Sequence, residues 1–346
     1  MLLLFLVGQN HVCAQNSSTT VKQCGIDQLC VDISFCPELT NESESFDHWL
    51  SRYKEMSAIL DDRFCGTEPK TGYRKFCCQI PPENKINTLG CGFPTENRIL
   101  IPIYNLFENP WMALIRDRRN RILCSGTVIA GSFILTTASC SRSDTDGAIT
   151  VRVGEYDISS SVDCSKRAKD CADQPHDVAV LKHILHPHYN PVTSENDIAL
   201  LKIVSVKFGE SVRPVCLSDE WQSRGSLVGW NSEVVPSKTL VNIVDSEKCV
   251  QTIAGYGNGT RKMDNKICLR MELSGNCQDA RQNTLPGSSF QAEFRPDRRL
   301  VQQGMLLAIS SCGESNRAIY AVLTNVTSYM DWIKDNMYYI HPRMRI

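Results

Sequence analysis

Cysteine content constrains this fold more than any other sequence feature, because the chain of 346 residues contains 17 cysteines. Cys13 follows an apolar N-terminal stretch, and without it the remaining cysteines form an even set that can pair completely. Disulfides persist in oxidising compartments and are rare in the cytosol. The sequence therefore predicts a secreted chain whose fold is stabilised by disulfides.

The N-terminus carries the pattern of a secretory signal. An apolar run at the start is followed by the small-residue sequence Val12-Cys13-Ala14, and we assign residues 1–15 to a signal peptide. No later stretch reaches the roughly 18 to 20 apolar residues of a membrane helix. A formal net charge of -1 argues against general affinity for nucleic acid or anionic membranes. Sequons compatible with glycosylation on the secretory route occur at Asn16, Asn41, Asn258 and Asn325.

A first cluster of cysteines occupies residues 24–78 and ends in the adjacent pair Cys77-Cys78. Apolar residues at helical spacing between positions 46 and 56 predict a short helix inside it. So short a segment needs disulfides to supplement its core. Zinc is the alternative, but the spacings lack Cys-x-x-Cys pairs and histidine ligands, so we predict no metal. Residues 79–98, which begin with prolines and polar residues, are predicted to be a linker.

From residue 99 to the end, short apolar runs alternate with turn residues, as in 149–153, 197–204, 300–309 and 318–326. Many short strands without intervening helices indicate an all-β barrel or sandwich. The chain closes with a predicted helix over 327–337, whose apolar face contains Tyr329, Trp332 and Ile333. Thr327 or Ser328 is expected to cap it.

Several segments in order resemble the trypsin-like serine proteases: residues 109–115, 124–129, 135–140, 196–201, 213–217 and 329–333. The cysteines of residues 24–78 resemble the clip domain that precedes such proteases in arthropods. The resemblance implies an all-β, chymotrypsin-like double β-barrel with a C-terminal helix over 99–346, preceded by a small disulfide-rich clip domain.

The resemblance also implies a disulfide pairing that the sequence alone leaves open. The implied clip pairs are Cys24–Cys77, Cys30–Cys65 and Cys36–Cys78. The implied pairs of the larger domain are Cys91–Cys216, Cys124–Cys140, Cys164–Cys171, Cys249–Cys268 and Cys277–Cys312. This pairing uses every cysteine after the signal peptide.

The catalytic positions implied by the resemblance carry the wrong residues for proteolysis. Ser139 stands in Thr-Ala-Ser-Cys where the family has its basic histidine, and a serine hydroxyl cannot accept a proton near neutral pH. Asp197 survives as the orienting acid, and we interpret it as a buried structural carboxylate. Counting from Cys277, Arg281 stands at the nucleophile position. Asp279 replaces a glycine of the oxyanion hole.

Other groups do not restore the chemistry. Ala280 replaces the aspartate that receives the new N-terminus after activation, and Gly275 stands where trypsin-like enzymes bind basic side chains. Ser288-Ser289 would be a displaced nucleophile without a base. The histidines at 176, 183, 186 and 188, including the potential metal pair His186 and His188, resemble a family surface loop and are interpreted as packing or solvated residues. We therefore predict that the protein is not an enzyme.

Two further features stay open. Arg98-Ile99 resembles the family's activation cleavage site, although Ile-Leu-Ile-Pro replaces Ile-Val-Gly-Gly, so cleavage and an ordinary surface arginine are both tenable. Residues 154–157 (Gly-Glu-Tyr-Asp) open the loop that binds calcium in some relatives. The Cys164–Cys171 pair would remodel that loop, and we predict no metal and no cofactor.

The functional prediction is a non-catalytic clip-domain serine protease homologue. It would act in the haemolymph as an extracellular cofactor or regulator of an innate immune protease cascade, in melanisation and prophenoloxidase activation. Its partners by resemblance would be other clip-domain proteases or prophenoloxidase, with microbial surfaces as a further partner. Its candidate binding surfaces are the clip domain, the basic segment 116–121 and the nucleophile loop 278–299. The alternatives are a microbial-surface recognition module, a decoy inhibitor, or a protease with rearranged catalytic groups.

Overall fold

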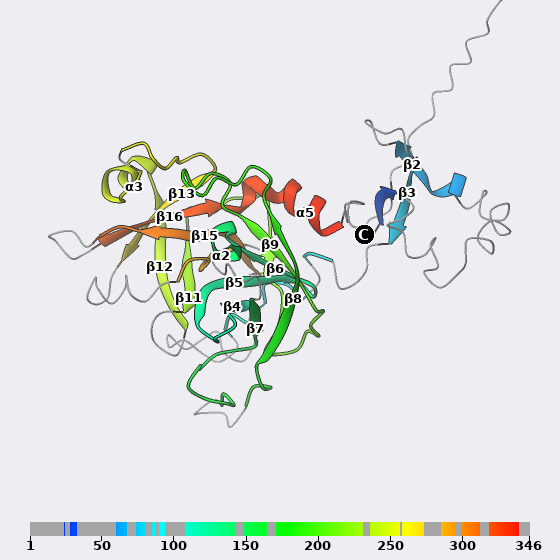
Figure 1. Ribbon diagram of the computed structural model, residues 1–346, viewed down its shortest axis with the longest axis horizontal. Coiled ribbons are helices and arrows are strands. Elements are labelled where there is room, and N and C mark those ends of the chain that lie inside the picture. Colours follow the sequence, from blue (N-terminus) through cyan, green and yellow to red (C-terminus); the bar gives the residue numbers. More distant parts are fainter. Residues whose placement is uncertain are drawn as a thin grey trace, which may run out of the picture. The chain divides into compact units, whose positions relative to one another are not determined.

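The computed structural model describes residues 24, 28–32, 60–67, 74–79, 85–87, 90–93, 108–142, 149–164, 171–230, 236–256, 258–272, 285–294, 299–311 and 318–338. The chain divides into two compact units, Met1–Ile80 and Pro81–Ile346 (Figure 1). The helix expected between residues 46 and 56 lies outside the described residues.

The smaller unit contains an antiparallel sheet with strand order β1-β3-β2, formed by β1 (Gln28–Asp32), β2 (Phe64–Thr67) and β3 (Arg74–Gln79). Disulfides join Cys24 to Cys77 and Cys30 to Cys65, so two of its strands are cross-linked. Cys36, expected to pair with Cys78, lies outside the described residues. This disulfide-rich region is consistent with a clip domain.

The first barrel of the larger unit has the closed order β4-β5-β6-β9-β8-β7. Its strands are β4 (Met112–Arg116), β5 (Ile122–Ala130), β6 (Phe133–Thr136), β7 (Thr150–Val153), β8 (His176–Leu185) and β9 (Ala199–Ile203). Side chains alternate along a strand, and β7 is accordingly buried at Val151 and Val153. These residues and the fully buried Trp111 belong to the largest apolar core.

The second sheet has the order β10-β15-β14-β11-β12-β13-β16, and an additional pairing of β15 with β16 closes it into a second barrel. Its strands are β10 (Cys216–Leu217), β11 (Arg224–Trp230), β12 (Pro236–Val244), β13 (Lys266–Glu272), β14 (Ser289–Phe294), β15 (Arg299–Ile309) and β16 (Ala318–Asn325). The predicted all-β, chymotrypsin-like double barrel is therefore confirmed.

Short helices flank the barrels: α2 (Ala138–Ser141), α3 (Ser246–Thr252), the 3-10 turn η4 (Val326–Tyr329) and α5 (Met330–Tyr338). The C-terminal helix is confirmed, but its expected cap at Thr327 or Ser328 is wrong. The helical segment begins one residue before the predicted range, with the 3-10 turn at the buried Val326, and Asn325 at the N-cap position makes no side-chain cap hydrogen bond. Our sequence analysis did not predict α3, which Asp245 caps by accepting a hydrogen bond from the Glu247 N–H.

The segment before the first barrel is attached to the larger unit. The Asn87 side chain accepts a hydrogen bond from the Leu217 N–H (2.8 Å) and donates one to the Leu217 carbonyl (2.7 Å). Cys91 is disulfide-bonded to Cys216. Gly92, at a φ of 69°, has no room for a side chain, because a Cβ there would lie 2.4 Å from the Leu300 carbonyl oxygen. Residues 85–93 therefore contribute to the larger unit.

Further disulfides join Cys124 to Cys140, Cys164 to Cys171 and Cys249 to Cys268. The first ties β5 to α2, and the third ties α3 to β13. Cys277 and Cys312 lie outside the described residues.

Candidate functional site

The junction of β6 with α2 presents Ser139 to Asp197. Thr137 follows the last residue of the strand and caps the helix by accepting a hydrogen bond from the Cys140 N–H. This turn directs the Ser139 N–H at Asp197 Oδ1, at 2.8 Å. The Ser139 hydroxyl lies 3.0 Å from the Thr137 hydroxyl and is hydrogen-bonded to it. Two positions that the sequence singled out are thus in direct contact.

Asp197 is a buried carboxylate, with only 4% of the residue exposed. Burial raises its pKa, and hydrogen bonds from Ser139 and from the Ala138 backbone oppose that rise. Its backbone carbonyl accepts a hydrogen bond from the Thr324 hydroxyl at 2.8 Å, which links the site to β16 of the second barrel. The carboxylate is therefore held by backbone N–H and hydroxyl groups.

His183, on strand β8, has a hydrogen-bond partner other than Asp197. His183 Nδ1 lies 2.9 Å from the Ser141 hydroxyl and forms a hydrogen bond with it. Within the described ranges, no hydrogen bond joins Asp197 to a histidine. The pair Asp197 and Ser139 provides a carboxylate and a hydroxyl, with no imidazole hydrogen-bonded to either among the described residues.

A segment of the second barrel packs against the strand that leads to the site. The Ser125 N–H donates to the Pro286 carbonyl at 2.8 Å, and the Leu285 N–H donates to the Trp230 carbonyl at 3.1 Å. Gly287 has a φ of 82°, and a Cβ there would lie only 2.0 Å from the Ser125 carbonyl oxygen. Pro286-Gly287 therefore forms a tight junction between the two barrels, at β5.

We did not single out this junction from the sequence. Its signal was the run Leu-Pro-Gly-Ser-Ser just before an apolar strand. Ser288 and Ser289 follow it and are both 0% exposed, and the Ser288 hydroxyl donates to the Leu285 carbonyl. Neither serine is accessible to a substrate in this arrangement.

Other predicted site residues are distributed as follows. Arg98, Ile99, Gly275, Asp279, Ala280, Arg281, Asn16 and Asn41 lie outside the described residues. The sequon residue Asn258 is exposed and accepts a hydrogen bond from the Thr260 N–H. Asn325 is half-buried and accepts one from the Thr327 hydroxyl.

The His186 ring packs against the C-terminal helical segment. Its centroid lies 5.4 Å from that of Tyr329 and 5.3 Å from that of Trp332. Burial lowers the pKa of His186, and the neighbouring His188 adds to the effect. The expectation that this histidine is a packing residue agrees with these contacts. In the part of the chain that the structure describes, the only grouping of potential metal ligands is Cys24, Cys30 and Cys65, which form disulfides.

Two closed barrels with a C-terminal helix define the chymotrypsin-like architecture, and comparison with known proteins gives the family. The family model described as Trypsin matches residues 104–333. The chain therefore belongs to the trypsin family. No helix among the described residues is long and apolar enough to cross a membrane.

Individual relatives cover most of the chain. It is 27% identical to "Serine protease grass" of Drosophila melanogaster over 82% of this chain and 81% of that protein. It is 30% identical to "CLIP domain-containing serine protease B4" of Anopheles gambiae over 97% of this chain and 96% of that protein. The crystal structure of the Drosophila Grass clip serine protease of the Toll pathway superposes with a TM-score of 0.62 and 26% identity, covering 90% of this chain and 94% of that one.

Proposed function

We propose that this chain is a non-catalytic member of the clip-domain serine protease group and acts by binding, as an extracellular regulator of an innate immune protease cascade. The contact between Ser139 and Asp197 carries the proposal. In the family's catalytic arrangement a histidine bridges the acid and the nucleophile. Here Asp197 Oδ1 is bonded to the Ser139 N–H, and the hydroxyl of that residue is bonded to Thr137.

The nucleophile segment supports the same proposal from two directions. Counting from Cys277 assigns Arg281 to the nucleophile position, and arginine is a cation without nucleophilic character near neutral pH. The packing at the barrel junction instead brings Pro286 to β5, and proline has neither a side-chain nucleophile nor an N–H for an oxyanion. Both features support a site without covalent catalysis.

Relatives suggest the process. The chain is 26% identical to "Phenoloxidase-activating factor 3" of Holotrichia diomphalia over 67% of its length, and it resembles the Grass protease of the Toll pathway. We infer that its partners are clip-domain proteases or prophenoloxidase in the haemolymph, and that it supports melanisation. Cleavage after Arg98 would leave the N-terminal part attached through the disulfide between Cys91 and Cys216.

The hairpin between β4 and β5 is the best-built binding surface among the described residues. Asp117, which is 5% exposed, accepts hydrogen bonds from the N–H groups of Arg119 and Arg121 at 2.8 Å and from Arg121 Nε at 2.6 Å. Burial of Asp117 opposes its ionisation, but these hydrogen bonds and the charge of Arg121 together outweigh burial and lower the pKa of Asp117. The hydrogen bonds to Asp117 hold the turn in one conformation, and the side chains of Arg118 and Arg119 are exposed.

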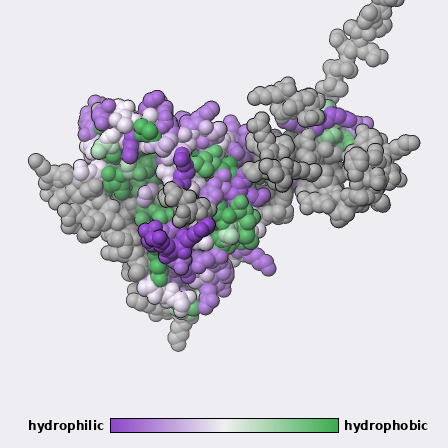
Figure 2. Space-filling model, viewed as in Figure 1, coloured by the Kyte–Doolittle hydropathy of each residue, from purple (hydrophilic) through white to green (hydrophobic). Residues whose placement is uncertain are grey.

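A fixed turn with two exposed cations suits an acidic surface on a partner, because little entropy is lost when it docks. Figure 2 shows strongly hydrophilic residues beside hydrophobic ones on the face that it draws. The basic segment 116–121 is therefore proposed as a protein-binding tip rather than a self-solvated loop.

The test reconstitutes a cascade from purified parts. An upstream clip-domain protease and prophenoloxidase are incubated with this chain, and phenoloxidase activity and complex formation are measured. We expect this chain to change the yield of active phenoloxidase without hydrolysing peptides itself, and Arg118→Glu/Arg119→Glu to abolish that effect. Lys207→Glu/Lys248→Glu is the matched control, since both lysines are exposed elsewhere on the unit.

The outcomes separate the alternatives. Unchanged phenoloxidase activity, combined with binding to microbial polysaccharide, would favour a recognition module. Inhibition of the upstream protease at equimolar amounts would favour a decoy. Equal loss of the effect in the arginine and lysine variants would show that the hairpin is not the binding surface.

A further inference from the structure

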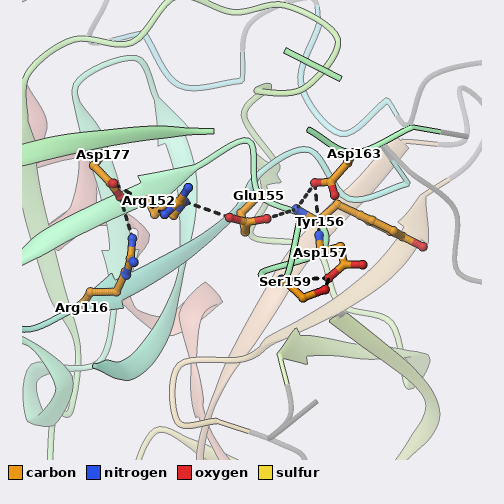
Figure 3. Close-up of polar contacts among 8 residues, drawn as sticks. All are labelled: Arg116, Arg152, Glu155, Tyr156, Asp157, Ser159, Asp163 and Asp177. Atoms are coloured by element: carbon orange, nitrogen blue, oxygen red, sulfur yellow. Dashed lines mark hydrogen bonds and ion pairs between the residues drawn. The ribbon is translucent and has the colours of Figure 1, made fainter. Parts of the chain in front are cut away.

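The loop that follows β7 is organised around a buried acidic residue. Glu155 begins this loop, and only 1% of its side chain is exposed. Figure 3 shows its carboxylate between Arg152 on one side and the Tyr156 backbone on the other. Arg152 Nε lies 2.8 Å from Glu155 Oε2 in an ion pair, and the Tyr156 N–H donates to Oε1 at 3.0 Å. Both carboxylate oxygens therefore face nitrogen groups of the chain.

Arg152 belongs to a chain of alternating charges that extends to the first barrel wall. Its Nη1 lies 3.6 Å from Asp177 Oδ2, and Asp177 Oδ1 accepts a hydrogen bond from Arg116 at 3.0 Å (Figure 3). These residues come from β4, β7 and β8, which are neighbours in the barrel. The guanidinium of Arg152 is consequently positioned by the barrel and not by the loop.

A second buried carboxylate closes the loop. Asp163, which is 4% exposed, accepts hydrogen bonds at its Oδ2 from the N–H groups of Tyr156 (3.2 Å) and Asp157 (3.1 Å). Its carbonyl accepts one from the Ala172 N–H at 2.7 Å. Burial raises the pKa of Asp163 and, despite the opposing charge of Arg152, also that of Glu155. The loop therefore contains two buried carboxylates, and a positive charge beside them would stabilise their ionised forms.

Some relatives meet this need with calcium, and the residues present here do not fit that ion. Calcium takes six to eight oxygen ligands at about 2.3–2.6 Å. A calcium ion at Glu155 Oε2 would meet the guanidinium of Arg152, which already lies 2.8 Å from that oxygen. Asp163 Oδ2 is committed to two backbone N–H donors. The carboxylate oxygens of this loop therefore face a guanidinium and backbone N–H groups, as in an ion pair, and not a metal ion.

We propose that Arg152 is the resident cation of the 154–172 loop, so that this loop keeps its structure without calcium. The barrel holds the guanidinium through Asp177, and the guanidinium neutralises Glu155. A buried acid that loses its counter-charge is strongly destabilising. The proposal concerns the loop alone and is independent of whether the protein is catalytic.

The first test compares thermal unfolding of the full-length chain in millimolar calcium chloride and in excess EDTA, together with calorimetric titration of calcium. We expect the same Tm in both buffers and no binding heat at this loop. A higher Tm in calcium, or calcium binding that Glu155→Gln removes, would overturn the proposal.

The second test is a charge cycle. Arg152→Gln should lower Tm by about 5 °C or more, and Arg152→Gln/Glu155→Gln should recover most of that loss because no buried charge then remains unpaired. Arg152→Lys keeps the charge and should leave the chain indifferent to calcium, which covers the case in which Arg152→Gln does not fold. Arg118→Gln is the control at an exposed arginine. A double variant no more stable than Arg152→Gln would refute the role of Arg152 as counter-ion.

Discussion

Asp197→Asn is predicted to stabilise the larger unit near neutral pH. Asp197 is 4% exposed, and burial raises its pKa, so its charged form is disfavoured in the folded state relative to the unfolded chain. Asparagine has nearly the same shape, and its carbonyl oxygen can still accept the hydrogen bond from the Ser139 N–H. Under the proposed non-catalytic function, the change would remove a buried charge and no catalytic group.

The magnitude follows from the opposing contributions. Each unit of pKa difference between the two states corresponds to about 1.4 kcal/mol. Hydrogen bonds from Ser139 and Ala138 and the positive charge of Lys266 favour the carboxylate, so only part of the burial cost is regained. We expect a gain of about 1 kcal/mol in the free energy of unfolding, which raises Tm by about 2–4 °C for a domain of this size.

The assay is thermal unfolding of wild type and Asp197→Asn between neutral and acidic pH. Because the pKa of Asp197 is raised in the folded state, the wild type recovers free energy of unfolding as pH falls through that pKa and the carboxylate is protonated. The difference in Tm between the variant and the wild type should therefore disappear by about pH 4, the usual pKa of an unfolded aspartate. Destabilisation by more than about 1 kcal/mol near neutral pH would refute this reasoning, since it would mean that the site needs the charge.

Two further predictions concern the same site. Ser139→His should give a folded protein, with stability within about 1 kcal/mol of wild type and no hydrolysis of fluorogenic peptides; measurable turnover would show that a nucleophile is in place. Gly287→Ala should destabilise the chain by about 2 kcal/mol or more in denaturant unfolding, because its Cβ would lie 2.0 Å from the Ser125 carbonyl oxygen. Gly90→Ala is the control, since its Cβ would meet nothing within 4 Å, and equal effects would contradict the tight junction.

Local patterns in the sequence sufficed for much of the fold. Alternating burial in strands such as β7 and the apolar face of α5 are properties of a few consecutive residues, so they can be recognised without knowing the tertiary structure. The contact of Ser139 with Asp197 was anticipated only because their flanking segments resemble the family. No rule of spacing would bring a residue of α2 to the segment just before β9.

Features that depend on long-range geometry were not predictable. The bidentate contact of the Asn87 side chain with Leu217 joins residues 130 positions apart, and an exposed asparagine carries no signal for it. The cap of the C-terminal helical segment was misplaced, because the segment opens with the 3-10 turn η4 at the buried Val326 and places Thr327 inside that turn. The ion pair of Arg152 with Glu155 spans only three residues, yet its importance rests on burial, which the sequence does not give.

The central claim is that this member of the trypsin family has no activated serine, and covalent labelling tests it most directly. The full chain, intact and after cleavage at Arg98 by an upstream clip-domain protease, is incubated with an active-site phosphonate and analysed by intact-mass spectrometry. N-terminal sequencing verifies the cut, and an active clip-domain protease serves as the positive control. The account predicts no added mass in either form. The account would be contradicted if one serine of the folded protein were labelled and the same serine were not labelled in protein denatured beforehand.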